Sequence, residues 1–250
     1  MSGDRRKVLG FDQRIRLEWL EAAAGHAASG KNYDEVREAL LDLLEGVVGG
    51  RRYASARSKT VTVLCRVWGG VVAGTEGLRG RALALLPAVS PGERVVIHWA
   101  MGLAAYPFFA DVASIVGRLL ELQAEAPMTH IARRTVEIWG DREKVRGAAQ
   151  KVVRSMADWG CLSESQTKGV FQRRDPQPDV RGEVAALLAE AVIIGCEQSS
   201  LALPQLVRHP AVFPFHLSLT AHDLRKSKCF EVDRQGLDTD VVSLSARAHS

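Results

Sequence analysis

The sequence predicts a mainly α-helical protein with an N-terminal helical bundle, a winged helix-turn-helix-like unit and a small C-terminal β-sheet. Apolar residues recur at helical spacing through residues 1–126. Within residues 127–200, a short helical segment is followed by a tight turn, a longer basic helix and a basic hairpin, and then by a packing helix. Prolines and alternating apolar segments mark residues 201–250 as a small β-containing region.

The first half of the chain should form about five helices packed as a bundle. Two of them are expected at about residues 11–28 and 33–48, and Asn32 or Asp34 can cap the second. Such a bundle accounts for most of the apolar side chains of this half as core residues. It therefore predicts a supporting role for residues 1–126.

The most apolar helix of the bundle is expected to begin at Pro91, with Ser90 as its N-cap. It contains the run 95–110, which is apolar except for one histidine. This run is shorter than the roughly 20 residues that span a bilayer, and Pro107 interrupts it. We therefore expect a buried helix of the bundle and no membrane segment.

A helix-turn-helix pattern begins after Pro127. Thr129 can cap a short helix that Gly140 ends, because glycine readily adopts the left-handed conformation of a helix C-terminus. Asp141 can cap the second helix, which runs to Trp159. At about 100° per residue, one side of the second helix is apolar: Val145, Ala148, Ala149, Val152, Met156 and Trp159. The opposite side is polar and basic: Lys144, Arg146, Gln150, Lys151 and Arg154.

A basic hairpin should follow the second helix. A Lys168-Gly169 turn fits a short two-stranded wing, whose tip and return strand would carry Lys168, Arg173 and Arg174. Between Thr129 and Arg174, ten basic minus five acidic residues leave +5, which exceeds the +4 of the whole chain. Such a concentration of positive charge indicates a surface that binds a polyanion.

Double-stranded DNA is the partner that this combination favours. A helix with one buried apolar side and one cationic side suits a major groove lined by phosphates, and Arg146 and Gln150 are expected to reach base edges. An ordinary solvated amphipathic helix is the competing interpretation of the same pattern. The candidate DNA contacts in this unit are Arg142, Lys144, Arg146, Gln150, Lys151, Arg154, Lys168, Arg173 and Arg174.

A second basic segment lies in the N-terminal half. Arg51, Arg52 and Arg57 belong to a stretch of five basic residues with no acidic residue before Glu76. They are candidates for a second phosphate-contacting surface. The alternative is a third helix of the bundle with a solvated basic face.

The C-terminal third changes in pattern. A strongly apolar helix is expected over about 180–197, packed between the two halves of the protein. Strands near 213–218, 229–234 and 240–244 should form a small sheet, with a short helix over 220–226.

The motifs that usually carry catalysis or bind metals and cofactors are missing from the sequence. It contains no phosphate loop, nucleophile elbow, Rossmann glycine pattern or paired metal-ligand motif, so we expect no enzyme, no cofactor and no metal site. His98, His209 and His216 lie in apolar segments, where a structural role is expected. Four widely spaced cysteines and a charged N-terminal stretch predict reduced thiols, no signal peptide and a cytoplasmic location.

Two segments resemble the BrxA proteins of BREX anti-phage defence clusters. The helix-turn-helix segment reads ARRTVEIWGDREKVRGAAQKVVRSMADWGCL, and the C-terminal segment reads CFEVDRQGLDTDVVSL. The resemblance implies a small, mostly helical accessory protein that binds DNA and works with other proteins of the defence system. Its basic helix would correspond to Arg142, Lys144, Arg146, Gln150, Lys151 and Arg154.

The functional expectation is a non-enzymatic protein that binds double-stranded DNA with weak sequence preference. A protein-interaction scaffold is the main alternative, in which the basic helix docks onto an acidic partner subunit. A metal-dependent nuclease is a third class, which the missing motifs disfavour.

Overall fold

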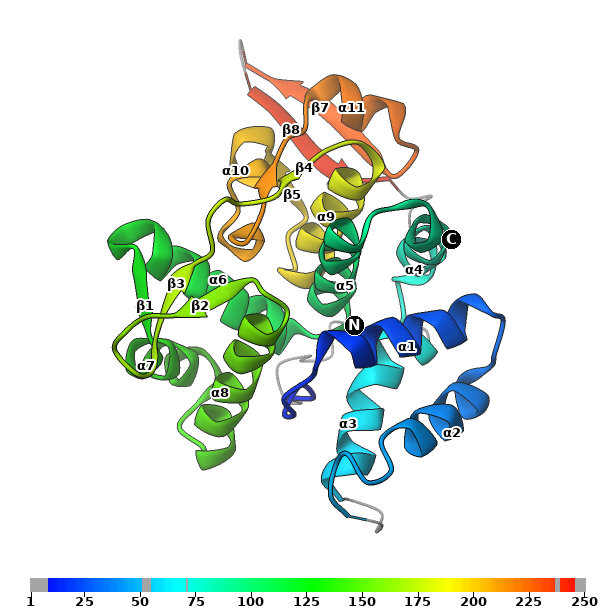
Figure 1. The fold of residues 1–250 in the computed structure, drawn as a ribbon. Coiled ribbons are helices and arrows are strands. Elements are labelled where there is room, and N and C mark those ends of the chain that lie inside the picture. The colour runs from blue at the N-terminus through cyan, green and yellow to red at the C-terminus, as the bar shows by residue number, and fades with distance from the viewer. Residues whose placement is uncertain (1–8, 51–54, 71, 237–238, 246–250) are drawn as a thin grey trace.

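The computed structural model describes residues 9–50, 55–70, 72–236 and 239–245, and it is mainly helical. Figure 1 shows three groups of elements around a central pair of helices. The N-terminal group consists of α1 (Leu17–Ala28), α2 (Tyr33–Leu43), α3 (Ala56–Leu64), the π-helical turn η2 (Cys65–Gly69), α4 (Glu76–Leu85) and the 3-10 turn η3 (Leu86–Ala88). The central pair is α5 (Pro91–Ala105) and α9 (Gly182–Gly195).

Local capping explains where several helices begin. Asn32 caps α2, and Ser90 caps α5, each in a reciprocal capping box with the glutamate three residues later. The expected caps at Asn32 and Ser90 are therefore confirmed. The first helix, in contrast, begins at Leu17 and not near residue 11, because the preceding segment is extended and packs against a distant helix.

The central pair is the core of the molecule. Nearly the whole of α5 from Val96 onward is buried, and α9 packs along it. Trp99 makes edge-to-face ring contacts whose partners come from three other parts of the chain: Phe109, Trp159, Phe213 and Phe215. Its indole nitrogen donates a hydrogen bond of 2.9 Å to the carbonyl oxygen of Ala211. A single contiguous hydrophobic core thus joins the three groups.

The second group, shown in green in Figure 1, carries the expected helix-turn-helix segment. Its elements are α6 (Pro107–Gln123), β1 (Glu125–Pro127), α7 (Met128–Trp139), α8 (Glu143–Asp158), β2 (Leu162–Glu164) and β3 (Val170–Arg173). The three strands form an antiparallel sheet in the order β1-β3-β2, in which Phe171 lies opposite both Ala126 and Glu164. The predicted two-stranded hairpin is confirmed, and β1 extends it to three strands.

The helix starts in this group differ from those predicted. Thr129 does not cap α7, because Pro127 already holds the N-cap position. Asp141 does not cap α8, because Arg142 holds the N-cap position without a side-chain cap, and the Asp141 carboxylate accepts a hydrogen bond from Arg146. Gly140 ends α7 with a φ of 83°, a conformation that glycine adopts without strain.

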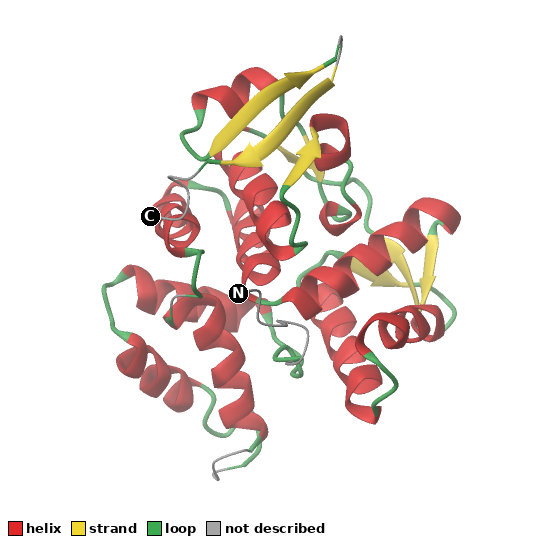
Figure 2. Ribbon diagram, turned by 180° about the vertical axis from the view of Figure 1, so that it is seen from behind, coloured by secondary structure: helices red, strands yellow, loops and turns green. Residues whose placement is uncertain are grey.

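The third group is formed by the C-terminal part of the chain. Figure 2 shows most of its strands together at the top. It comprises β4 (Asp179–Val180), β5 (Ser200–Ala202), α10 (Leu203–Val207), the 3-10 turn η4 (Pro210–Val212), β6 (His216–Leu217), α11 (Ala221–Lys226), β7 (Phe230–Gln235) and β8 (Thr239–Leu244). The predicted short helix is α11, and a capping box at Thr220 begins it.

The predicted composition of the C-terminal sheet was partly wrong. The strands β7 and β8 pair as expected, but the third strand of their sheet is β5. The segment expected near 213–218 instead contributes β6, which pairs in parallel with β4, a strand that follows the β2–β3 hairpin in the chain. This pairing lies within the third group and joins residues 37 positions apart in the chain.

No single helix of the described residues is long and apolar enough to cross a membrane. The pair α5 and α6 passes that test of length and composition only when the two helices are taken together, and they meet at a bend of 118°.

His209 has a structural role, which predicts an acid-sensitive fold. Its Nδ1 atom accepts a hydrogen bond of 3.2 Å from the backbone nitrogen of Ala211 at the start of η4. Burial lowers the pKa of His209 to about 4, and the positive charge of Arg118 acts in the same direction. An unfolded histidine binds its proton near pH 6.5, so the unfolded state gains stability as the pH falls from about 6.5 to about 4.

We expect His209 to lower the free energy of unfolding by roughly 2 to 3 kcal/mol over this pH range. His209→Asn keeps a side-chain acceptor for Ala211 but does not titrate, so it should flatten the profile. Urea titrations at a series of pH values would measure this. Identical pH profiles for the two proteins would contradict the assignment.

Candidate nucleic-acid interface

One side of α8 presents the basic residues predicted from its sequence. Lys144, Arg146, Gln150, Lys151 and Arg154 are all exposed. The opposite side, including Val145, Val152 and Met156, is buried against the rest of the protein. The predicted division of this helix into an apolar and a cationic side is confirmed.

The end of α8 is anchored in the core. Trp159, at the C-cap, lies against Phe11, Trp99 and Phe109, and its indole nitrogen donates a hydrogen bond of 2.8 Å to the carbonyl oxygen of Ile15. Because the helix is fixed at this end, its exposed side chains project from a rigid support.

A groove of about 410 Å³ runs between α8 and the turn of the β2–β3 hairpin. Gln150 and Arg154 from α8 and Lys168 from the hairpin turn line it. The tight turn is held in place because the Glu164 carboxylate accepts a hydrogen bond of 2.7 Å from the backbone nitrogen of Gly169. The structure thus brings two of the predicted helix contacts, Gln150 and Arg154, and the predicted wing contact Lys168 to one surface, which we call the α8–hairpin groove.

Arg14 also lines this groove, together with the acidic residues Asp158 and Glu164, and sequence patterns did not reveal Arg14. Its guanidinium donates two hydrogen bonds of 2.6 Å to the carboxylate of Asp158, and 53% of its side chain is exposed. This bidentate hydrogen bond raises the pKa of Arg14. Arg14 lies 144 residues before Asp158, so no local spacing could have placed it here.

The segment that carries Arg14 is extended and bound along α8. The backbone nitrogen of Ile15 donates a hydrogen bond of 2.8 Å to the hydroxyl of Ser155. The ammonium of Lys151 donates one of 2.7 Å to the carbonyl oxygen of Asp12. Lys151 is therefore engaged within the protein, whereas Arg154 on the same helix lines the α8–hairpin groove.

Two further predicted contacts near the start of α8 have intramolecular partners. Arg146 lies 3.0 Å from Asp141 in an exposed ion pair, and Arg142 donates a hydrogen bond of 3.2 Å to the carbonyl oxygen of Trp139. Exposed ion pairs of this kind contribute little and exchange readily for another anion. Arg146 therefore remains accessible to a ligand.

The other predicted contacts lie elsewhere. Arg173 is at the far end of β3 from the hairpin turn, where it donates a hydrogen bond to Gln177. Arg174 lines a small cavity beside Trp159 and Gly160, at the C-terminal end of α8. Arg173 thus lies on the return strand as predicted, but the structure does not bring it or Arg174 to the tip of the hairpin with Lys168.

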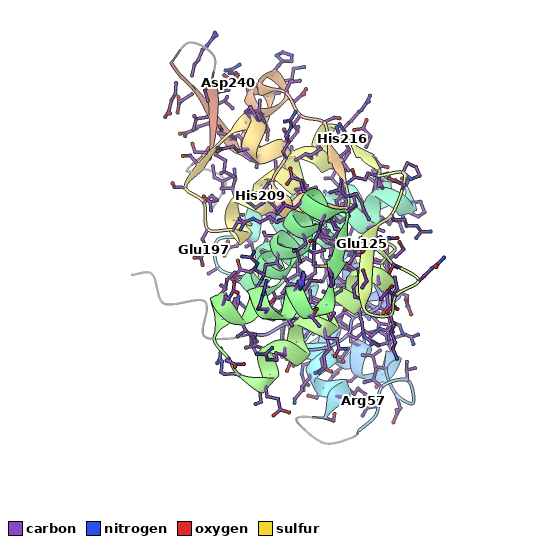
Figure 3. The ribbon with its side chains drawn as sticks, turned by 90° about the vertical axis from the view of Figure 1, so that its left-hand side faces the viewer. Arg57, Glu125, Glu197, His209, His216 and Asp240 are labelled. Atoms are coloured by element: carbon purple, nitrogen blue, oxygen red, sulfur yellow. The ribbon has the colours of Figure 1, made fainter. Side chains whose placement is uncertain are left out.

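The second basic segment is not adjacent to α8. Arg57, on α3, is largely buried and lies 3.7 Å from Glu45. Figure 1 shows α3 and α8 in different groups, and Figure 3 places Arg57 at the lower end of the molecule. Arg51 and Arg52 lie outside the described residues.

Burial raises the pKa of the cysteine thiols, to about 11 for Cys65 and about 12 for Cys196, and it raises that of Cys161 further. These thiols therefore have little thiolate character near neutral pH. No group of three or more histidine, cysteine, aspartate or glutamate side chains in the described part of the chain could hold a metal ion.

Comparison of the chain with models of known protein families, with curated proteins and with solved structures finds no match. Its function is therefore inferred from its own surface.

Proposed function

We propose that this protein is a non-enzymatic, winged helix-turn-helix protein that binds double-stranded DNA through α8 and the β2–β3 hairpin. The observation that carries the proposal is the convergence of Arg154, Gln150, Lys168 and Arg14 on the α8–hairpin groove. The chain order α6-β1-α7-α8-β2-β3 and the strand order β1-β3-β2 support the assignment, because a hairpin directly after the second helix is placed to contact DNA beside it.

In this proposal the N-terminal half of α8 enters the major groove. A groove about 12 Å wide accepts one helix, and Arg146 and Gln150 lie on the exposed side at positions from which they reach base edges. Lys144 and Arg154 contact phosphates on either side, while Lys168 and Arg14 contact the backbone next to the hairpin. Binding is dominated by phosphate contacts and therefore has weak sequence preference.

On the basis of the resemblance to BrxA, we further propose that the protein acts in a BREX-type anti-phage defence system in the cytoplasm, with other proteins of that system as further partners. A DNA-binding accessory subunit needs a charged surface and a stable scaffold, and it needs no catalytic centre. This role is therefore consistent with the proposed DNA binding.

The first test measures binding to a fluorescently labelled random duplex by fluorescence anisotropy, over a series of salt concentrations. About four to six phosphate contacts predict a slope of about −4 to −5 in a plot of log affinity against log salt concentration. Absence of binding at low salt would overturn the proposal.

Arg146→Ala/Arg154→Ala should lower DNA affinity about 100-fold at moderate salt, since each lost contact to a charged group costs about tenfold. Both side chains are exposed, so the melting temperature should hardly change. The matched control is Arg181→Ala/Arg225→Ala, which removes two exposed arginines from the third group. Equal losses in the two double mutants would show that only net charge matters and would remove α8 from the proposal.

Arg14→Ala should weaken DNA binding by about tenfold and reduce the salt slope by about 1, because one phosphate contact is lost. Asp158→Asn is expected to have the opposite effect on DNA affinity. It frees Arg14 from its carboxylate partner and removes a negative charge from the groove, so the affinity for DNA should rise. Unchanged binding in both variants would exclude the extended N-terminal segment from the interface.

The alternative is a scaffold that docks an acidic partner subunit. Exposed apolar side chains favour some protein partner, because Tyr33, Leu43 and Val47 lie in or just after α2 with 45%, 46% and 58% of their surface exposed. They are remote from α8 in Figure 1. Competition separates the two functions: a partner that binds α8 is displaced by duplex DNA, and one that binds α2 is not.

A further inference from the structure

A second groove, of about 370 Å³, lies at the other end of β3 from the hairpin turn. The second half of α6, the end of β3 and the segment 207–217 enclose it. Two histidines of that segment, His209 and His216, are labelled in the upper part of Figure 3, where the C-terminal segments meet the green helices. We call it the α6–η4 groove.

Arg173 enters this groove with part of its hydrogen-bonding capacity unused. One terminal nitrogen of its guanidinium donates a hydrogen bond of 3.3 Å to the side-chain oxygen of Gln177. Gln177 is itself fixed, because its amide nitrogen donates a hydrogen bond of 2.5 Å to the carbonyl oxygen of Phe213. The Nε atom of Arg173 is buried and has no hydrogen-bond partner among the described residues.

A buried N–H of a charged group without an acceptor is costly, and such groups are rare in folded proteins. The Gln177 contact holds the guanidinium in one orientation, so the cost of ordering it is already met in the free protein. The guanidinium is therefore held in one orientation where Arg173 lines the groove.

The charge around the α6–η4 groove favours an anion. Arg208 lines the groove, is exposed, and forms no ion pair within the described residues. Between Glu197 and Asp223 the chain contains no acidic residue, so the wall formed by 207–217 contributes no negative charge. Glu121 of α6 is the opposing carboxylate among the lining residues, against the two arginines.

His209 adds a neutral donor. Its Nδ1 atom accepts a hydrogen bond from Ala211, and this contact assigns the proton of the neutral ring to Nε2. Phe213 and Phe215 supply apolar surface beside these donors. The lining is about equally polar and apolar, and the volume lies within the usual range of small-molecule sites.

We propose that the α6–η4 groove binds a small organic phosphate, with Arg173 and Arg208 as its main contacts. Two guanidinium groups and the His209 N–H offer more donors than the two oxygens of a carboxylate can accept. A phosphate group has three terminal oxygens and more negative charge, and the planar guanidinium fork matches its geometry. This site does not rest on DNA binding by α8, because none of the residues that line the α8–hairpin groove lines it.

Isothermal titration calorimetry of the full chain would test the proposal with four probes: adenosine 5′-monophosphate, inorganic phosphate, adenosine and citrate. We expect the nucleotide to bind in the micromolar to low millimolar range, inorganic phosphate to bind more weakly, and adenosine not to bind. Tighter binding of citrate than of either phosphate would overturn the choice of phosphate. Absence of nucleotide and phosphate binding would overturn the site itself.

Substitutions of the lining residues test whether the nucleotide binds in the α6–η4 groove. Arg173→Met and Arg208→Met should each weaken nucleotide binding at least about tenfold, whereas Glu121→Gln should strengthen it because a repulsive charge is removed. Arg225→Met is the matched control and should leave binding unchanged. Arg208 is exposed, so its variant tests the site even if Arg173→Met fails to fold. Nucleotide binding that is the same in wild type and Arg208→Met would contradict the proposal.

Measuring duplex DNA binding in the same variants separates nucleotide binding at the α6–η4 groove from DNA binding at α8. Arg208→Met should leave DNA affinity unchanged while it abolishes most nucleotide binding, and Arg146→Ala/Arg154→Ala should do the reverse. A loss of both activities in Arg208→Met would mean that the two grooves are not independent.

Discussion

Gly117→Ala is expected to destabilise the protein by about 3 kcal/mol or more, the upper end of the cost of overpacking a core. Gly117 lies in α6, where a methyl group would collide with the backbone carbonyl of Pro210 and press on Phe213. The obstacle is backbone, so it cannot be relieved by the rotation of a side chain. Urea denaturation would show a lower midpoint with a similar dependence on denaturant.

A second helical glycine provides the matched control. Gly80 lies in α4, and a methyl group there would meet nothing within 4 Å. Gly80→Ala should therefore stabilise the protein by about 0.5 to 1 kcal/mol, because alanine favours the helix. We expect changes in the free energy of unfolding that have opposite signs at the two positions. A Gly117→Ala protein of unchanged stability would mean that α6 does not contact η4 as closely as described.

Arg81→Met is expected to destabilise the protein by about 2 to 3 kcal/mol. Arg81 on α4 donates hydrogen bonds of 2.5 Å to both carboxylate oxygens of Glu190 on α9, and only 2% of the Glu190 side chain is exposed. Removing the guanidinium takes away the cation nearest to a buried carboxylate, which costs about 3 to 5 kcal/mol at a fully buried site. The lower figure applies because 38% of the Arg81 side chain is exposed and solvent screens part of the loss.

A double-mutant cycle isolates this interaction. Glu190→Gln keeps the shape of the side chain without its charge, so Arg81→Met/Glu190→Gln should be more stable than Arg81→Met alone. Arg225→Met breaks the exposed pair with Asp240 and should cost less than about 1 kcal/mol. Additive effects of the two mutations would show that Arg81 does not stabilise the Glu190 carboxylate.

Short-range rules were sufficient to predict the local features of this protein. Helix starts at Asn32, Ser90 and Thr220 were predictable because a capping side chain bonds backbone groups two or three residues away. The two sides of α8 were predictable for a similar reason, since helical geometry alone decides which residues share a side. The mainly helical class and the Lys168-Gly169 hairpin follow from the same short-range rules.

Contacts between residues far apart in the chain became known from the tertiary structure and could not be predicted from local patterns. The segment before Leu17 is extended because Ile15 forms backbone hydrogen bonds with Ser155 and Trp159, which outweigh its helical pattern. Hence Arg14 joins the α8–hairpin groove. The same holds for β6, which pairs with β4 instead of the neighbouring hairpin. Arg173 follows its strand away from the hairpin turn and into the α6–η4 groove, because the register of β3 sets its position. These contacts join residues far apart in the chain, and the periodicity of either segment contains no information about the other.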